Sequence, residues 1–359
     1  ALERGGPGLT EMDREAIGSV GLIVFGLGEV DVEEIAPVDP EELASSVDGD
    51  EEAARAIRML SVMSLADGEI DAENTALVRA YADALGVAPD YLDILTEAAA
   101  DEIAQAAACI VRKNAESFPH LDSSRRSISA VAPFFPYKDA PDPEFEARYK
   151  TLGDLPAGSF GLAFFDHFHE NGFFFPGNPD GFTTPHDSSH VLSGYSTSKG
   201  GEICISTFIG AMHPDHPIAA EGMPIIFSWH LGVKLNDIAN STTGDLRAPP
   251  LLDRRERGSQ VTTDIVAADW DFWAATPVPF EDPRTTYGVP PVDRRCWPGC
   301  RGRRKPAPRK GGGVARRRPL APRSGTRGVP RRGPWRRCPE RPEFVTNRNP
   351  PRLDRTNGM

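Results

Sequence analysis

The clearest pattern in this chain is a helical repeat of apolar residues between positions 51 and 115. Apolar side chains recur there at three- and four-residue spacing, as on the buried face of a helix, at Ala56, Met59, Leu60 and Met63. A break at Asp67-Gly68 is followed by Asp71, which we expect to cap a second helix that Gly86 ends. A third helix is expected over residues 88–110. The pattern therefore predicts a small, acidic, helical module.

Helical spacing returns after a proline-rich stretch. Five prolines interrupt residues 115–150, so this stretch is expected to connect modules. A new helix is expected to begin at residues 155–159 and to end at Asn171-Gly172. One face of this helix carries Leu162, Phe165, Phe168 and His169. Another helix is expected from Thr184 to Ser193. The element Glu202–Met212 is interpreted as a helix, although its alternation fits a strand nearly as well.

These patterns predict an all-α fold in five parts. The parts are an acidic N-terminal segment over 1–50, a helical module over 51–115, a proline-rich linker over 116–150, a larger helical domain over 151–293 and a basic tail over 294–359. In the first part, Asp39-Pro40 has the residues of a helix start.

Charge separates the tail from the rest of the chain. Residues 1–293 carry 19 basic and 49 acidic residues, a formal charge of −30, whereas residues 294–359 carry 21 and 3, a charge of +18. No nucleic acid is expected on the acidic body, because phosphates repel it. The tail is rich in Arg, Pro and Gly and is expected to be disordered. It is either a nucleic-acid-binding arm or the product of out-of-frame coding sequence.

The sequence contains neither a recognisable membrane-spanning segment nor a disulfide framework. The longest apolar stretches, such as residues 20–27 and 223–229, are far shorter than the roughly 18 residues that a membrane-spanning helix needs. No signal peptide is recognised at the start of the chain. Only Cys109 and Cys204 of the five cysteines precede the tail, too few for a disulfide framework. A cytoplasmic location is expected.

The candidate chemistry is concentrated in a histidine-rich region. Seven of the eight histidines fall between His167 and His230. On a helix that begins at Thr184, His190 lies about 40° and Asp187 about 100° around the axis from His186. Two histidines four residues apart are the arrangement that clamps a divalent metal in zincin-type sites. Asp187 is shorter than the Glu of those sites, so we expect it to act as a ligand rather than as a general base.

A second carboxylate follows at a spacing that allows it to return to these histidines. Eleven residues separate His190 from Glu202, enough for a helix end, a loop and the start of the next element. Two histidines with one or two carboxylates suit zinc, iron(II) or manganese. The other histidines are expected to play structural roles: a solvated loop for His213 to His216, and core or surface positions for His167 and His169.

At this point the sequence resembles a known family. The stretch His186-Asp187-Ser188-Ser189-His190, followed after eleven residues by Glu202, is similar to the His-Asp-x-x-His-(x11)-Glu motif of the coenzyme Q biosynthesis protein four family. Residues 155–161, the stretch after His190, Asp269-Trp270-Asp271 and residues 283–289 also resemble that family. The resemblance covers about residues 151–292.

This resemblance implies an all-helical domain with a divalent metal beside a cavity for a prenyl chain. The implied metal ligands and catalytic residues are His186, Asp187, His190 and Glu202, with zinc the first expectation and iron or manganese the alternatives. The implied reaction replaces the ring carboxyl of a prenylated quinone precursor by hydroxyl. The implied setting is the inner face of the membrane, with a prenylated aromatic lipid as substrate, other quinone-biosynthesis proteins as partners and possible assembly as a homo-oligomer.

The acidic helical module carries a second, shorter resemblance. Residues 66–73 do not form a calcium-binding EF-hand, because that register would place Met63 and Leu65 at ligand positions and Asn74 at the terminal one. Their Ala-Asp-Gly turn resembles that of tellurite-resistance TerB-like domains, over about residues 50–112. A generic acidic helical hairpin is the alternative.

Three interpretations of function are open. The chain is either the metal-dependent enzyme or a prenyl-lipid-binding scaffold that organises quinone-biosynthetic enzymes around a structural metal. A third interpretation is a TerB-like stress-sensing or envelope-sensing protein that has acquired the metal domain.

Overall fold

The fold is taken from a computed structural model, which describes residues 8–117, 135, 137–182, 184–213, 217–235 and 240–291. Every regular element in these ranges is a helix, and they contain no strand beyond isolated bridges. The predicted all-α class is therefore confirmed. The prediction of a disordered basic tail falls outside the described residues.

The N-terminal segment contains more helix than its turn-rich composition predicts. Helix α1 (Glu11–Ser19) begins at a capping box formed by Thr10 and Asp13, and a π-helix (Val20–Val24) continues it. Helix α2 (Pro40–Ser46) begins at Asp39, whose carboxylate accepts from the Glu42 N–H as predicted.

The module that follows has four helices where the sequence pattern predicts three. They are α3 (Asp50–Met63), α4 (Ala72–Ala84), α5 (Tyr91–Ala99) and α6 (Ile103–Glu116). The predicted cap is confirmed, because Asp71 accepts from the Asn74 N–H at 2.7 Å. The single helix predicted over 88–110 is wrong. Asp101 has a φ of 65°, in the left-handed region, and this residue separates α5 from α6.

The predicted linker also contains a helix. Helix α7 (Pro143–Lys150) begins at Asp142, whose carboxylate accepts from the Phe145 N–H, and a 3₁₀ turn (Thr151–Asp154) follows it. Tyr149 is only 2% exposed and joins the core of the larger domain. The end of the predicted linker is therefore helical and packs on the larger domain.

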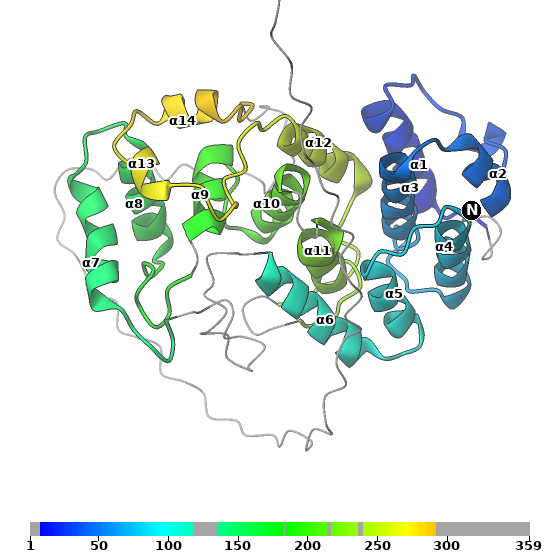
Figure 1. The fold of residues 1–359 in the computed structure, drawn as a ribbon, viewed down its shortest axis with the longest axis horizontal. Coiled ribbons are helices and arrows are strands. Elements are labelled where there is room, and N and C mark those ends of the chain that lie inside the picture. The colour runs from blue at the N-terminus through cyan, green and yellow to red at the C-terminus, as the bar shows by residue number, and fades with distance from the viewer. Residues whose placement is uncertain are drawn as a thin grey trace, which may run out of the picture. The chain divides into compact units, whose positions relative to one another are not determined.

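The larger domain surrounds the histidine-rich region with short helices. In chain order they are α8 (Phe160–Asn171), α9 (Thr184–Ser193), α10 (Lys199–Met212), the π-helix η7 (Pro217–Gly222), α11 (Met223–Trp229), α12 (Ala248–Ser259), α13 (Phe272–Ala275) and α14 (Glu281–Thr286). Helix α9 contacts both α8 and α10 (Figure 1). The predicted ends of α8 are confirmed: Ser159 caps its start, and Gly172 ends it with a left-handed φ of 71°.

An aromatic core holds these helices together. Phe164 and Phe168 on α8 have ring centroids 4.7 Å apart, and Phe168 stacks on Phe175 at 4.9 Å. Helix α10 packs closely on α12. The helices approach so closely at Gly258 that a Cβ there would overlap the Phe208 carbonyl oxygen. Burial of each large aromatic ring stabilises the fold by about 1.5–3 kcal/mol. The core therefore fixes α9 and α10, the two helices that carry the predicted site.

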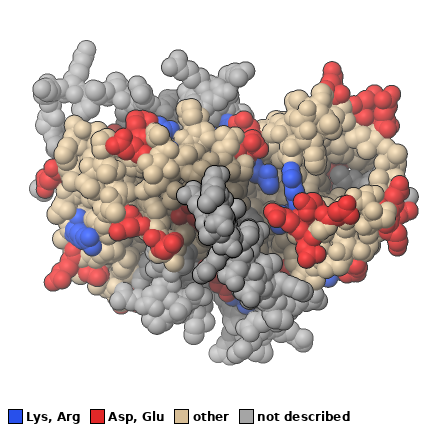
Figure 2. All heavy atoms as spheres, turned by 45° about the horizontal axis from the view of Figure 1, so that its top comes forward, with Lys and Arg blue, Asp and Glu red and all other residues tan. Residues whose placement is uncertain are grey.

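Among the charged residues visible on one face of the described part of the chain, acidic ones predominate (Figure 2). On the face shown in Figure 2, acidic side chains in red cover much more area than basic side chains in blue. This agrees with the formal charge of residues 1–293.

Candidate metal centre

Helix α9 presents two of the predicted ligands, of which His190 is buried and His186 is partly exposed. Pro185 occupies the first turn, where its missing N–H costs no helical hydrogen bond. The side chains of Ser188 and Ser189 are fully buried, and the Ser189 hydroxyl donates to the Pro185 carbonyl at 2.9 Å. Small residues at these positions let the neighbouring helices approach. As a result His186 and His190, one turn apart, face α10.

A tight return loop brings Glu202 opposite these histidines. Ser198 caps α10 and accepts from the Gly201 N–H at 3.3 Å. A Cβ on Gly201 would overlap the carbonyl oxygen of Ser196, so only glycine allows the loop to close this tightly. The interpretation of Glu202–Met212 as a helix is confirmed, because these residues belong to α10. Glu202 lies in the first turn of that helix.

Three predicted ligands converge in the structure. Glu202 Oε2 lies 3.2 Å from His186 Nε2 and 3.4 Å from His190 Nε2, and the two Nε2 atoms are 3.1 Å apart. All three atoms fall within 4.8 Å of one another, close enough to share one cation. Two imidazoles and a carboxylate are a donor set that zinc, iron(II) and manganese accept.

The electrostatics of this cluster favour a positive charge at its centre. Burial lowers the pKa of His186, but the hydrogen bond and negative charge of Glu202 outweigh burial and raise it to about 9. Burial raises the pKa of Glu202, but the close contacts with the imidazoles of His186 and His190 outweigh this effect and hold the pKa well below its usual range. Without a metal, the two shifts favour a proton on His186 and a negative charge on Glu202. A divalent cation would replace that proton.

Asp187 is the one predicted ligand that the structure does not bring to the cluster. Its Oδ1 lies 3.1 Å from Nε2 of His167 on α8, and its side chain is 5% exposed. A helix turns about 100° per residue, so position 187 faces α8 while positions 186 and 190 face α10. The predicted set of four is therefore assembled only in part, with Asp187 bound to a neighbouring histidine.

The structure adds His167 to the surroundings of the cluster. Its ring stacks on the His190 ring, with centroids 5.8 Å apart and planes 22° apart, while its Nε2 faces Asp187. From the sequence, only a core or surface position is expected for this residue. The clustering of seven histidines was the one signal that pointed to it, because no spacing rule links α8 to α9.

Two further titratable residues of this domain, His213 and Glu221, are also buried. His213 is 3% exposed, and its Nδ1 lies 2.6 Å from Asp264 Oδ2, so the predicted solvated loop is wrong for this residue; His216 lies outside the described residues. Glu221, on η7, is 3% exposed and accepts from the Ser117 hydroxyl at 3.4 Å. Burial raises its pKa to about 7, against the opposing positive charges of His186 and His213.

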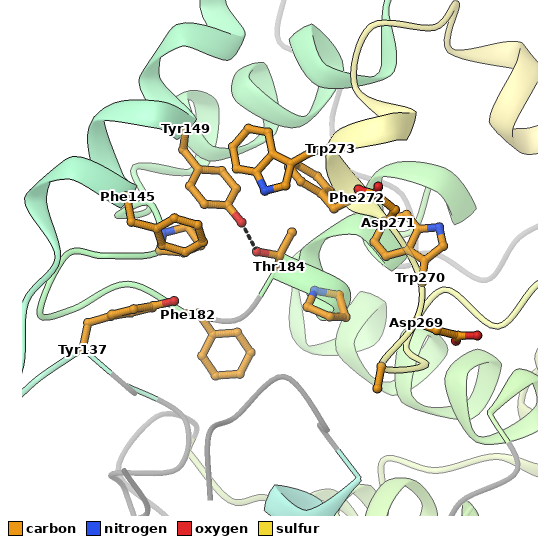
Figure 3. Close-up of a pocket in the computed structure, with 13 residues that line it drawn as sticks. Tyr137, Phe145, Tyr149, Phe182, Thr184, Asp269, Trp270, Asp271, Phe272 and Trp273 are labelled. Carbon is orange, nitrogen blue, oxygen red and sulfur yellow. Dashed lines mark hydrogen bonds between the residues drawn. The ribbon is translucent and has the colours of Figure 1, made fainter. Parts of the chain in front are cut away.

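An aromatic cavity opens at the start of α9 (Figure 3). It has a volume of about 480 Å³. Its lining residues are Tyr137, Phe145, Tyr149, Pro176, Phe182, Thr184, Pro185, Ala268, Asp269, Trp270, Asp271, Phe272 and Trp273. The Tyr149 hydroxyl and Thr184 Oγ1 are 2.5 Å apart across it. The Phe182 ring contacts the His186 ring edge to face, with centroids 5.5 Å apart. The cavity therefore shares a wall with the candidate metal centre.

Comparison with known proteins adds no relative. No family model, no curated protein and no solved structure matches this chain. Among the described helices, none is both long enough and apolar enough to cross a bilayer. The sequence motif and the geometry of the site are therefore the two features that bear on function.

Proposed function

We propose that this chain is a metal-dependent protein of quinone biosynthesis that acts at the ring carboxyl of a prenylated aromatic precursor. The observation that carries the proposal is the convergence of His186, His190 and Glu202 from two helices at the spacing of the family motif. Asp187 belongs to the same motif, and we assign it the orientation of His167 and the start of α9.

The donor set supports a catalytic use of the metal. Three protein ligands leave at least one coordination position open, as in catalytic rather than closed structural zinc sites. A bound divalent cation would supply a Lewis acid that holds the ring carboxylate or phenolate and stabilises the charge left as carbon dioxide departs. Replacement of a carboxyl by hydroxyl is a net oxidation, so the reaction also requires an oxidant such as dioxygen.

The aromatic cavity supports the proposed substrate class. Its volume of about 480 Å³ lies within the usual range for small-molecule sites. Rings from α7, α13 and the loop before α9 form its walls, and such walls bind apolar chains and flat aromatic rings. Because Phe182 contacts both the cavity and His186, a ligand in the cavity could extend to the metal.

Contact with a membrane surface is part of the same proposal. Phe173 and Phe174 follow the end of α8 and are 42% and 52% exposed. Adjacent exposed aromatic residues are typical of interaction sites, including those at membranes. The Phe173 ring also contacts His167 edge to face, with centroids 5.9 Å apart, so this exposed pair lies near the site.

One observation favours the alternative function, a prenyl-lipid-binding scaffold with a structural metal. The His190 side chain is only 1% exposed, and buried ligands are typical of metals that stabilise a fold. In this alternative the cavity presents a lipid intermediate to partner enzymes, and no reaction takes place at the metal.

Variants of the cluster distinguish the two functions. We expect His190→Ala and Glu202→Gln to lose the metal, to keep their helical content and to abolish product formation, with elemental analysis, circular dichroism and lipid mass spectrometry as measurements. His169→Ala is the matched control, because His169 is exposed on α8 and lies outside the cluster. If the metal-free variants still support quinone synthesis, the enzyme function is wrong and the scaffold function stands.

A further inference from the structure

The proton on His190 decides whether this residue can bind a metal through Nε2. His190 Nδ1 lies 3.2 Å from the backbone carbonyl oxygen of Tyr195. A carbonyl oxygen only accepts, so Nδ1 carries a hydrogen, and in the neutral imidazole Nε2 then keeps its lone pair. This lone pair faces His186 and Glu202, which is the orientation that metal coordination needs.

The carbonyl that fixes this proton lies outside helix α9. Gly194 has a φ of 80° and ends the helix in the left-handed region. Tyr195 then donates its N–H to the Ser193 hydroxyl at 3.3 Å. Because Tyr195 lies beyond the end of α9, helix geometry alone does not orient its carbonyl, and contacts outside this helix contribute to its position.

Arg257, on α12, makes those contacts. Its guanidinium donates to the Ser193 carbonyl at 2.8 Å and to the Pro290 carbonyl at 2.9 Å. It also lies over the rings of Tyr195 and Phe208, 5.0 Å and 5.3 Å from their centroids. One planar side chain therefore ties the backbone and the ring of the turn 193–195 to α10 and to the end of the domain.

The chemistry of this contact requires arginine. Only a guanidinium donates in one plane to two carbonyls while its face lies on an aromatic ring. Arg257 is 8% exposed, and burial of a charged group costs free energy, so a side chain that served packing alone would be apolar.

We propose that Arg257 is a positioning residue that holds the turn 193–195 so that the Tyr195 carbonyl keeps His190 in its Nδ1–H tautomer. The proposal deepens the proposed function, on whose metal site it rests for its effect on affinity. The tautomer itself is a property of the metal-free chain.

The test compares Arg257→Met and Arg257→Lys with the wild-type full chain. In metal-free protein, ¹H–¹⁵N spectra of the histidine side chains are expected to show His190 protonated at Nδ1. Arg257→Met should populate the Nε2–H form, and Arg257→Lys should give an intermediate result. We expect the affinity for zinc to fall about 10- to 100-fold in Arg257→Met, as for loss of other groups that orient ligands.

Arg284→Met is the matched control for loss of a stacked arginine. Arg284, on α14, lies 5.3 Å over the Phe280 ring, and this contact is remote from the turn 193–195 in the chain. It should leave both the tautomer and the zinc affinity unchanged.

Three other results would each decide whether Arg257 has this positioning role. Folded Arg257 variants with a wild-type His190 tautomer and wild-type zinc affinity would show that Arg257 only packs, and the proposal would be wrong. Failure of both variants to fold would assign Arg257 to the stability of the domain and also reject it. If the tautomer changes but wild-type protein binds no zinc, the positioning role holds while the proposed function fails.

Discussion

At the residue scale, the candidate centre behaves as a set of groups whose charges depend on one another. The negative charge of Glu202 keeps a proton on His186, and the same carboxylate contacts His190. Asp187 acts on a different neighbour, because its carboxylate pairs with His167. Three of the four motif residues therefore share one centre, and the fourth, Asp187, pairs with His167.

Asp187→Asn tests this division. If Asp187 only orients His167, the amide keeps a hydrogen bond and the zinc affinity should fall less than about 10-fold. Glu202→Gln should cost about 100-fold or more, since it removes a charged donor atom from the centre. Isothermal titration with zinc measures both. A loss in Asp187→Asn equal to that in Glu202→Gln would restore the four-ligand set.

Glu221 gives a prediction for the dependence of stability on pH. Burial raises its pKa to about 7 in the folded chain, above the ordinary value of 4.5. The folded state therefore holds this proton more tightly, and wild-type stability falls as pH rises from 4.5 to 7 and stays lower above 7.

Glu221→Gln removes this dependence. Between about pH 5 and pH 8, the free energy of unfolding of the variant should rise relative to wild type by about 2 to 3 kcal/mol, from about 1.4 kcal/mol per pKa unit. Urea unfolding in the presence of a chelator measures the difference. A difference that is constant with pH would show that Glu221 is ionised in the folded chain at pH 5.

At the element scale, local signals explain the helix ends that the sequence predicts correctly. Asp71, Ser159 and Gly172 each act through their own backbone or through neighbours within four residues. The break between α5 and α6 lies in an Ala-rich run compatible with one helix, so only Asp101 in a left-handed conformation reveals it. Helix α7 is too short to show an apolar period.

The contacts of the site also differ in whether local sequence signals can predict them. The spacing of His186, His190 and Glu202 follows from one helix, one loop and the next helix, and sequence analysis finds it. The pairs Asp187–His167 and His213–Asp264 depend on how distant segments pack, because the partners are 20 and 51 positions apart in the sequence. No periodic pattern encodes such contacts, so sequence analysis misses them.

The return loop between α9 and α10 gives a prediction at this scale. Because a Cβ on Gly201 would overlap the Ser196 carbonyl oxygen, Gly201→Ala must displace the first turn of α10 and Glu202 with it. We expect a loss of about 1–3 kcal/mol in the free energy of unfolding and weaker zinc binding. Gly18→Ala is the control, since its Cβ would meet nothing within 4 Å. Wild-type zinc affinity in Gly201→Ala would contradict this account of the loop.

At the scale of the whole molecule, the last helix of the N-terminal module packs on the larger domain. Helix α6 contacts η7 and α11. Asn114 donates to the Ala220 carbonyl at 2.5 Å, and Ser117 donates to Glu221. Through α6, the module therefore reaches the buried acid beside the candidate centre, and the sequence boundary near residue 115 separates residues that contact one another.

Two truncations separate the role of α6 from that of the rest of the module. Removal of residues 1–102 keeps α6, so zinc binding and any quinone phenotype should persist, and a sensing role of the module would then be accessory. Removal of residues 1–117 also takes away Ile110, which is fully buried, and the hydroxyl that donates to Glu221. Each large apolar side chain lost from such a contact costs about 1.5–3 kcal/mol, so this protein should melt at least several degrees lower. Thermal unfolding followed by circular dichroism measures the difference. Equal melting temperatures for the two truncations would show that α6 contributes nothing to the larger domain.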